Sequence, residues 1–307
     1  MTSKNAKRSM PPSQSMQSAV NEFLTSRRAR LSPKEVGLRP GGKGRRVPGL
    51  RREEVAALAG VSLDYYTRLE RGRLQGASDS VLSGIADALR LDDVERAYLL
   101  ALAHGGEGST TSPELPPSTK AVLAHVKAPA LAITAAQDIA GANLLGRALF
   151  DAVYREYPDQ EHPNMARFAF IGESAQEFYG THWGEAQVLI AAMLRMQAAQ
   201  HPANTDLAAV ITGLLEASDR FRMAWERHDV HEHRSGTKTY HHPVVGDLPM
   251  TYDVFNLPGV TGLSITVYGP QPGTDAEERI AALACWAHEQ DFAATGDFPS
   301  LPTAACL

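Results

Sequence analysis

The sequence predicts a protein of two domains, an all-α N-terminal domain followed by an α+β domain with an antiparallel sheet. The first observation is the segment 105–117, whose Gly, Ser, Thr and Pro give it the composition of a linker. The second is that only helical periodicity precedes this segment, whereas strand-like runs follow it. The third is charge: residues 1–104 carry 18 Lys and Arg against 11 Asp and Glu, whereas residues 105–307 carry 12 against 24. A basic first part therefore precedes an acidic second part.

The N-terminal domain is assigned to residues 18–104, after a polar, basic tail at 1–17 that is expected to be disordered. A loop at 37–49 is rich in Gly, Pro and Arg. Apolar residues at helical spacing predict five helices, one before this loop and four after it. These are 19–30, 51–59, 63–71, one capped by Ser78 or Asp79 that runs to 89, and one beginning at Asp92 or Asp93 that runs to 102.

The most informative stretch is 50–72, LRREEVAALAGVSLDYYTRLERG, which predicts two short helices joined by a tight turn. Gly60 can take the positive φ of such a turn, Ser62 is a strong N-cap for the second helix, and Gly72 ends that helix. The residues expected to face inwards are Val61, Tyr66 and Leu69. This combination is typical of a helix-turn-helix, which places its second helix in the major groove of DNA.

The opposite side of the second helix is expected to read DNA bases. Its residues are Leu63, Asp64, Thr67 and Arg68. Arg68 can donate two hydrogen bonds to guanine, and Asp64 can accept one from cytosine. The Leu63 side chain or the Thr67 methyl group can touch a thymine methyl group. The alternative is an ordinary helical hairpin with a solvated charged face, in which Asp64 merely suits a helix N-terminus.

Basic residues flank the two helices and are expected to contact the phosphate backbone. They are Lys43, Arg45, Arg46, Arg51, Arg52, Arg71 and Arg73. Arg52 stands at the start of the first helix, where the helix N-terminus also suits a phosphate. The acidic second part of the chain would be repelled by DNA, so one DNA-binding surface is expected. The loop 41–46 lacks the order of a nucleotide-binding loop, and no strand precedes it.

The second domain is assigned to residues 118–290, followed by a C-terminal tail at 291–307. The predicted helices are 118–126, 144–154, 183–200, 205–218 and one that runs from a cap at Thr274 or Asp275 to 288. The predicted strands are 129–134, 237–245, 249–257 and 263–268. The last three strands are separated by short turns and predict an antiparallel meander flanked by helices. Such a sheet is a common place for a small-molecule cavity.

Five histidines lie between residues 228 and 242 and could ligate a divalent metal. They are His228, His231, His233, His241 and His242. No cysteine joins them and their spacing is not that of a structural zinc site, so neither a metal nor a cofactor is expected. One or two of them are expected to line a pocket or to hydrogen-bond to the backbone, and the others to be solvated. The candidate ligand-binding residues are Trp225, His228, Tyr240, His241 and Tyr252, although core packing explains the aromatic ones equally well.

Other features exclude some classes of protein. The chain has no run of about 18 apolar residues for a membrane span, and its N-terminus has no apolar core of a secretory signal, so a cytoplasmic location is expected. Residues 172–175, Gly-Glu-Ser-Ala, do not form the elbow of a hydrolase nucleophile, and no enzymatic activity is expected. Cys285 and Cys306 are not expected to make a disulfide framework, and Cys285 is expected to be buried and unreactive.

The N-terminal domain resembles the Xre-type, lambda-repressor-like helix-turn-helix family. The whole chain resembles the MmyB-like subgroup, which joins this domain to a PAS-like ligand-binding domain. The matching stretches are GLRPGGKGRRVPGLRREEVAALAGVSLDYYTRLERGR at 37–73, FRMAWERHDV at 221–230 and KTYHHPVVGDLPMTYDVFNLPG at 238–259. The resemblance implies five helices in the first domain and base contacts from the four outward residues named above. It also implies a small effector, fatty-acid-like or otherwise apolar, in the second domain.

The residues and the resemblance together predict a bacterial, sequence-specific transcription regulator. Because one recognition helix reads few base pairs, the regulator is expected to bind an inverted repeat in double-stranded DNA as a homodimer. The effector is expected to favour one arrangement of the two DNA-binding domains. Two alternatives stay open: a metal-dependent sensor or enzyme that uses the histidines at 228–242, and a dimerisation module without a ligand.

Overall fold

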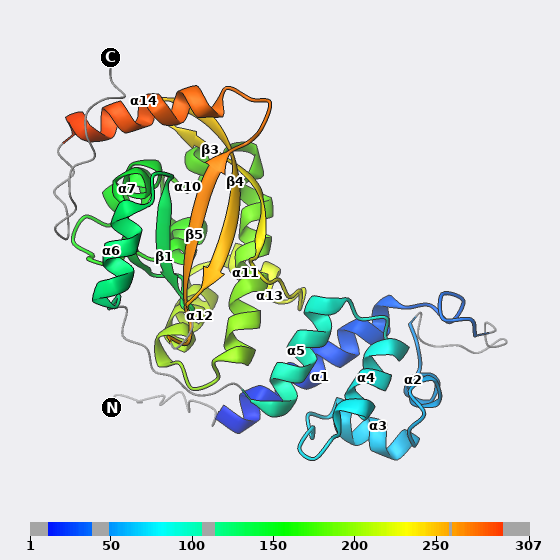
Figure 1. The fold of residues 1–307 in the computed structure, drawn as a ribbon. Helices are drawn as coiled ribbons and strands as arrows, with labels where there is room; N and C mark the ends of the chain where they lie inside the picture. The colour runs from blue at the N-terminus through cyan, green and yellow to red at the C-terminus, as the bar shows by residue number, and fades with distance from the viewer. Residues whose placement is uncertain (1–11, 39–48, 106–113, 258–259, 291–307) are drawn as a thin grey trace, which may run out of the picture. The chain divides into compact units, whose positions relative to one another are not determined.

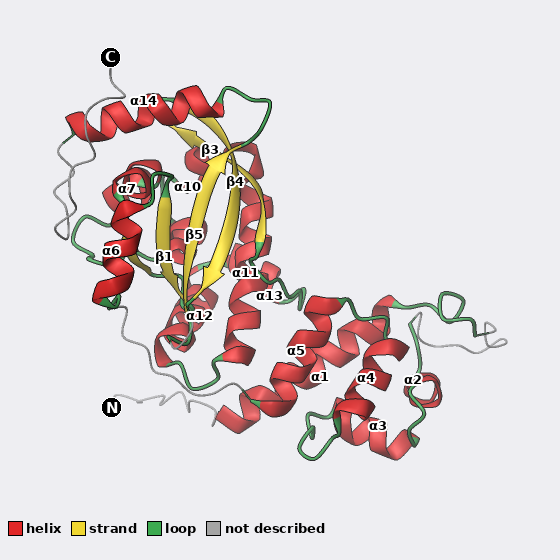
Figure 2. Cartoon of the chain, viewed as in Figure 1, coloured by secondary structure: helices red, strands yellow, loops and turns green. Residues whose placement is uncertain are grey.

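The structure, a computed structural model, describes residues 12–38, 49–105, 114–257 and 260–290. The chain divides into two compact units, one formed by 1–108 with 199–203 and the other by 109–198 with 204–307. Figure 2 shows helices alone in the N-terminal domain and helices with strands in the C-terminal domain. The predicted order, an all-α domain followed by an α+β domain, is therefore confirmed.

The N-terminal domain contains five helices within its described residues. They are α1 (Pro12–Arg30), α2 (Arg52–Leu58), α3 (Leu63–Glu70), α4 (Asp79–Ala88) and α5 (Asp93–His104), all seen in Figure 1. The start of α1 shows that the prediction of a disordered tail is wrong for residues 12–17. Pro12 suits the first turn of a helix, and neither Gly nor a second Pro interrupts the sequence before the helix ends.

Aromatic packing and side-chain caps stabilise these helices. Phe23 of α1 meets Tyr98 of α5 edge to face, with the ring centroids 4.9 Å apart. Helices α4 and α5 begin after Ser78 and Asp92, whose side chains each accept a hydrogen bond from the N–H three residues further on. The sequence left open whether Ser78 or Asp79 caps α4 and whether Asp92 or Asp93 caps α5. The structure shows that Ser78 and Asp92 are the caps.

A five-stranded antiparallel sheet forms the centre of the C-terminal domain. Its strands are β1 (Ala130–Thr134), β2 (Ile139–Ala142), β3 (Ser235–His242), β4 (Gly246–Asn256) and β5 (Leu263–Pro270). Their order across the sheet is β2-β1-β5-β4-β3, and Figure 1 labels the last four of these strands. The predicted meander is present as β3-β4-β5, and β1 pairs with β5 beside it. The sequence did not predict β2, because its four residues, IAGA, are few and small.

Nine α-helices accompany this sheet in the described part of the C-terminal domain. They are α6 (Pro117–His125), α7 (Leu144–Leu149), α8 (Asp151–Glu156), α9 (Met165–Ile171), α10 (Ala175–Tyr179), α11 (Trp183–Gln200), α12 (Thr205–Ala217), α13 (Asp219–Trp225) and α14 (Ala276–Glu289). A 3-10 turn, η1 (Gly180–His182), separates α10 from α11. The predicted helix 144–154 is divided at Phe150, where α7 ends and α8 begins. Helices α9, α10 and α13 were not predicted, because five to seven residues give little periodicity.

The two faces of the sheet meet different parts of the domain. Along β1, Leu131 belongs to the main core, whereas Ala130 and Ala132 belong to a smaller cluster with Leu115 and with Leu123 of α6. This follows from the alternation of side chains along a strand. We call the face towards the main core the inner face. It includes Leu131, Tyr240, Leu248, Met250, Tyr252 and Tyr268.

Three further expectations, on the linker, the cysteines and a membrane span, can be compared with the structure. Leu115 is buried against Gly141, so the last residues of the predicted linker belong to the fold. Cys285 of α14 is half-buried and disulfide-bonded, so the expectations of no disulfide framework and of a buried, unreactive Cys285 thiol are wrong. Spacing along a sequence does not show which cysteines meet in space. No helix in the described ranges has the length and apolar character needed to cross a membrane.

Candidate DNA-binding helix and candidate ligand-binding face

A glycine turn and a serine cap position α3. Gly60 has a φ of +67°, in the left-handed region that glycine favours. The Ser62 hydroxyl accepts a hydrogen bond from the Tyr65 N–H at 3.1 Å, as an N-cap does. Gly72 has a φ of +87° after the end of α3, and a Cβ there would lie 2.5 Å from the Cα of Gln17 on α1. The predicted turn, cap and helix end are therefore confirmed.

The side of α3 away from the core is open to solvent. Tyr66 and Leu69 are at most 1% exposed, whereas Leu63 is 45% exposed. Asp64 and Arg68 are exposed as well, and Thr67 is half-buried beside them. Helix α3 therefore presents on its accessible side the four residues that the sequence proposes for reading bases.

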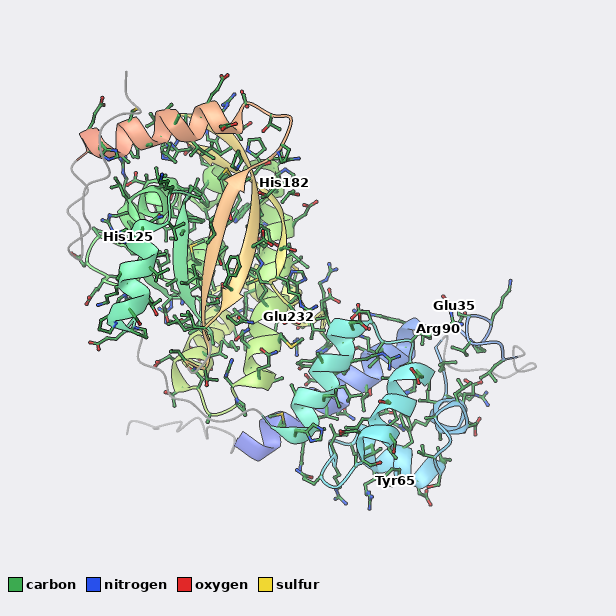
Figure 3. The ribbon with its side chains drawn as sticks, in the orientation of Figure 1. Glu35, Tyr65, Arg90, His125, His182 and Glu232 are labelled. Atoms are coloured by element: carbon green, nitrogen blue, oxygen red, sulfur yellow. The ribbon has the colours of Figure 1, made fainter. Side chains whose placement is uncertain are left out.

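Tyr65 lies next to this group and was missed by sequence reasoning. The Arg68 guanidinium carbon lies 4.9 Å from the centroid of the Tyr65 ring, which is a cation–π distance. Figure 3 labels Tyr65 on α3. The three-residue spacing of an aromatic ring and an arginine on one helix could have revealed this pair. The contact favours this orientation of the exposed Arg68 side chain.

A buried carboxylate fixes the end of α3. Glu70 is fully buried, and its side chain accepts hydrogen bonds from Thr25 and Arg28 of α1 and from Arg52 of α2. Asn21 of α1 donates a further hydrogen bond to the Glu70 backbone carbonyl at 3.0 Å. Burial raises the pKa of Glu70, but the hydrogen bonds from the two arginines outweigh it and hold the pKa below its usual range. Sequence reasoning missed Glu70, because its partners are distant in the chain.

The residues predicted to contact phosphates fall into three groups. Lys43, Arg45 and Arg46 lie outside the described residues. Arg51, Arg71 and Arg73 are exposed. Arg52 differs, because its Nε and Nη2 donate to the Glu70 carboxylate at 3.2 and 3.1 Å while 47% of its side chain stays exposed. Arg52 therefore joins α2 to α3, a role that its place in the sequence did not indicate.

Two of the predicted ligand-binding residues lie on the inner face of the sheet. Tyr240 is buried, with its ring centroid 5.2 Å from that of Phe150 and 4.9 Å from that of Phe178. Tyr252 is buried as well and stacks on His233 with ring centroids 4.3 Å apart. Burial raises the pKa of both tyrosines, so their hydroxyl groups are neutral at physiological pH.

The other three predicted residues are not all brought to this face. Trp225, at the end of α13, is half-buried and stacks on Phe221 with the ring centroids 5.5 Å apart. His228 follows in the loop with a φ of +53°. His241 alternates with Tyr240 along β3 and therefore faces away from the inner face. Its Nδ1 lies 2.7 Å from an Asp247 carboxylate oxygen. The expectation that His241 lines a pocket with Tyr240 is thus corrected.

The histidines at 228–242 take separate places. The ring centroids of His231 and His233 are 6.5 Å apart. His242 is buried, and its Nε2 donates a hydrogen bond to the Ala148 carbonyl at 3.2 Å. In the part of the chain that the structure describes, no three His, Cys, Asp or Glu side chains gather as metal ligands would. Four of these imidazoles, those of His231, His233, His241 and His242, thus make hydrogen bonds or ring contacts.

Two basic side chains beside the aromatic residues were also missed. Lys238 of β3 places its Nζ 4.6 Å from the centroid of the Tyr252 ring. Arg195 of α11 places its guanidinium carbon 4.1 Å from the centroid of the Trp225 ring. Nothing in the sequence near either residue signalled a buried cation. The structure therefore adds positive charge to a region that sequence reasoning treated as aromatic and neutral.

Two family models match the chain. The model of the MmyB-like transcription regulator ligand binding domain matches residues 115–284, and the model of a helix-turn-helix domain matches residues 21–99. Because the first match covers more than half of the chain, the protein belongs to the MmyB-like transcription regulators. No curated protein matches the chain.

The fold and the two matches define a ligand-responsive, DNA-binding transcription regulator. Helices α2 and α3 form its helix-turn-helix, inside the matched range 21–99. The five-stranded sheet with its helices forms the ligand-binding domain. The predicted resemblance to an Xre-type regulator with an MmyB-like domain is confirmed, and both matched domains are those of regulators rather than of enzymes.

Proposed function

We propose that the protein binds an inverted-repeat operator as a homodimer in the cytoplasm and has no enzymatic activity. The observation that carries this proposal is the contrast between the two sides of α3. Tyr66 and Leu69 on one side are buried in the domain, whereas Leu63 on the other side is accessible to DNA. Since one such helix contacts few base pairs, two copies that read half-sites one helical turn apart would give useful specificity.

Each outward residue of α3 has a role in this proposal. Arg68 donates hydrogen bonds to guanine O6 and N7. In the absence of DNA, the Tyr65 ring orients the Arg68 guanidinium group through a cation–π contact. Asp64 accepts from a cytosine amino group, and Leu63 or Thr67 contacts a thymine methyl group. Glu70 supports them indirectly, because it attaches the end of α3 to α1 and α2.

Arginines around α3 would contact the phosphates. The exposed residues Arg51, Arg71 and Arg73 serve this role, as does the exposed part of Arg52. Lys43, Arg45 and Arg46 are proposed to extend this contact. Each phosphate contact lowers the logarithm of the affinity by about 0.9 per tenfold increase in salt concentration.

The C-terminal domain would bind a small-molecule effector at the inner face of its sheet. Trp225, His228, Tyr240 and Tyr252 are the proposed contacts, and their aromatic rings favour a ligand with an apolar, fatty-acid-like part. The effector would change operator affinity to the extent that it binds one arrangement of the dimer more tightly than the other.

Selection from a pool of random duplexes tests the DNA-binding part. The full-length protein is expected to enrich an inverted repeat, and fluorescence anisotropy is expected to show two chains bound per duplex. A pool that remains random after selection would overturn sequence-specific binding. Enrichment of a single half-site bound by one chain would overturn the homodimer alone.

A further inference from the structure

The last helix of the C-terminal domain carries a disulfide. Cys285 of α14 is disulfide-bonded, and Cys306 is the only other cysteine in the sequence. Cys306 lies outside the described residues, so its pairing with Cys285 follows from this count. The bond therefore links α14 to a residue that comes after the helix in the chain.

Cys285 lies on the side of α14 that faces away from the core. Helix α14 packs against α7, β4 and β5, and its buried residues are Ala276, Leu283 and Ala287. Cys285 is two residues from both Leu283 and Ala287, which places it roughly 160–200° around the helix from them. Ala281 and His288, which share its side of the helix, are exposed. Opening the disulfide would therefore leave the buried side of α14 intact.

This position makes the disulfide open to exchange with small thiols. Exchange requires that a thiolate reaches one of the two sulfur atoms, so its rate depends on access. Cys285 is only half-buried, on the side of the helix where its neighbours are exposed. In the cytoplasm, the location proposed above, small thiols keep most cysteines reduced, and the disulfides that form there are usually catalytic or redox-sensing.

The residue after Cys285 joins α14 to the interior of the domain. Trp286 packs against the main core and meets the His242 ring at the end of β3, with the ring centroids 5.0 Å apart. His242 Nδ1 accepts a hydrogen bond from the Val244 N–H, so its Nε2 carries the proton that is donated to the Ala148 carbonyl of α7. Burial lowers the pKa of His242 to about 4, so this imidazole is neutral at physiological pH. One aromatic contact thus connects the end of α14 to β3 and α7.

We propose that Cys285 and Cys306 form a reversible redox site that changes between a disulfide and two thiols on the folded protein. The co-reactant is a small disulfide or a small thiol, such as oxidised or reduced glutathione. In oxidation, one cysteine thiolate attacks the small disulfide and expels a thiolate, and the second cysteine thiolate attacks the mixed disulfide and expels the other. The two cysteine protons pass to the released thiolates, so one small disulfide is reduced to two thiols as the protein is oxidised.

The oxidised form would restrain the C-terminal end of α14. A disulfide reduces the number of conformations open to the chain that it closes, and helix ends open more readily than helix centres. Cys285 lies one turn before the last residue of α14, Glu289. Reduction would let this turn open more often and would weaken the contact between Trp286 and His242. The redox state would then be an input to the ligand-binding domain that is separate from its small-molecule effector.

Mass spectrometry of the folded, full-length protein in mixtures of reduced and oxidised glutathione tests the exchange. Reduction is expected to add the mass of two hydrogen atoms and to let iodoacetamide label both cysteines instead of neither. An excess of oxidised glutathione should reverse both changes. A disulfide that resists reduced glutathione until urea unfolds the protein would overturn the redox site and make the bond structural. Mixed disulfides at both cysteines without an internal disulfide would also overturn it.

Hydrogen exchange tests the effect on α14. Amides in the last turn of α14 and at the end of β3 are expected to exchange faster in the reduced protein than in the oxidised one. Cys285→Ser and Cys306→Ser should both lose this difference and behave like the reduced wild type in either buffer. Ala282→Ser, at an exposed position of the same helix, is the control and should keep it. Equal exchange in both wild-type states would overturn the restraint of α14, and a response confined to α14 would overturn its connection to β3.

The inference rests on the proposed function for the cytoplasmic location alone, and operator selection in both redox states separates the two. A disulfide that exchanges in a protein that selects no duplex would keep the redox site and overturn the proposed DNA binding. An inverted repeat selected by a protein whose disulfide never exchanges would keep the DNA binding and overturn the redox site.

Discussion

Glu70 in the N-terminal domain and Lys238 in the C-terminal domain are charged groups withdrawn from solvent, and their surroundings act on the two charges in opposite ways. Glu70 in the N-terminal domain is surrounded by donors, since Arg28, Arg52 and Thr25 all bind its carboxylate. Lys238 in the C-terminal domain meets only a neutral imidazole and a tyrosine ring. Burial acts against the charge in both, but only for Glu70 do neighbours reverse the pKa shift.

The difference indicates what each domain does. A buried charge with all its partners inside the protein fixes one geometry, as α3 requires if its outward residues are to meet bases in register. A buried charge without an opposite charge makes its residue a candidate for a functional site. Within the described residues, the buried charge of Glu70 is therefore compensated by its neighbours, whereas Lys238 pairs with no carboxylate.

The largest expected effect is on Glu70. Glu70→Gln removes the negative charge that pairs with two arginines and leaves the partly buried Arg28 without a counter-charge, so the free energy of unfolding should fall by about 3–5 kcal/mol. Because the pKa of Glu70 is lowered, this contribution is present above the ordinary pKa of 4.5 and is lost as the pH falls through the folded value. Urea denaturation at pH 7 and at lower pH measures both effects. The exposed pair Arg51–Glu53 supplies the control Glu53→Gln, expected to cost under about 1 kcal/mol. An equal cost for both variants would contradict the role of Glu70.

Lys238→Met should act in the opposite direction and stabilise the protein. Native Lys238 loses its proton near pH 8 and an unfolded lysine near 10.5, so the unfolded chain binds more protons between these values and stability rises with pH. Below pH 8 the cost of burying the ammonium group is fully present. The variant should therefore gain about 1–3 kcal/mol at pH 7, and the gain should vanish above about pH 10.5. Denaturation curves of Lys238→Met across this range measure it, with Lys120→Met at an exposed position of α6 as the control. A destabilised Lys238→Met would mean that the lysine is structural.

Arg68→Ala tests the accessible side of α3. Loss of its bidentate contact should cost about 1–3 kcal/mol in operator binding and relax the preference at one base pair. Anisotropy titrations with the selected duplex and with a scrambled duplex measure the two losses separately. Tyr65→Ala should show a weaker form of the same effect, because it removes only the ring that orients Arg68. If Arg68→Ala weakens both duplexes equally, Arg68 does not read bases.

The smallest expected effect is that of Arg71→Ala on the salt dependence. Loss of one phosphate contact should reduce the slope of log affinity against log salt by about 0.9 and weaken all sequences alike. Arg71 is preferable to Arg52 for this test, since Arg52 also binds Glu70. A slope that does not change would show that Arg71 makes no phosphate contact.

The N-terminal domain could be predicted closely because its signals are local. Gly60, Ser62 and Gly72 act within a few residues, so the turn, the cap and the end of α3 follow from the sequence. Glu70 could not be assigned in this way, because its hydrogen bonds reach Thr25 and Arg28, which lie 45 and 42 residues away. The bounds of α3 could therefore be predicted from local residues, whereas the tertiary contacts that stabilise it could not.

The C-terminal domain was predicted less fully for two reasons. Its short elements, such as β2 and α10, hold too few residues to establish a period. The predicted site also depended on which face of β3 each residue occupies. Tyr240 and His241 both looked suitable, but alternation separates them, and the same alternation brings Lys238 to the inner face. The register of the sheet therefore decided the site, and the sequence did not specify it.

Native mass spectrometry of the full-length protein with its selected duplex tests the central claim most directly. We predict two chains on one duplex and a small molecule on the folded protein that is lost on unfolding. A protein that forms no complex with any selected duplex, and that has the bare mass of its chain before and after unfolding, would contradict a ligand-responsive regulator of DNA.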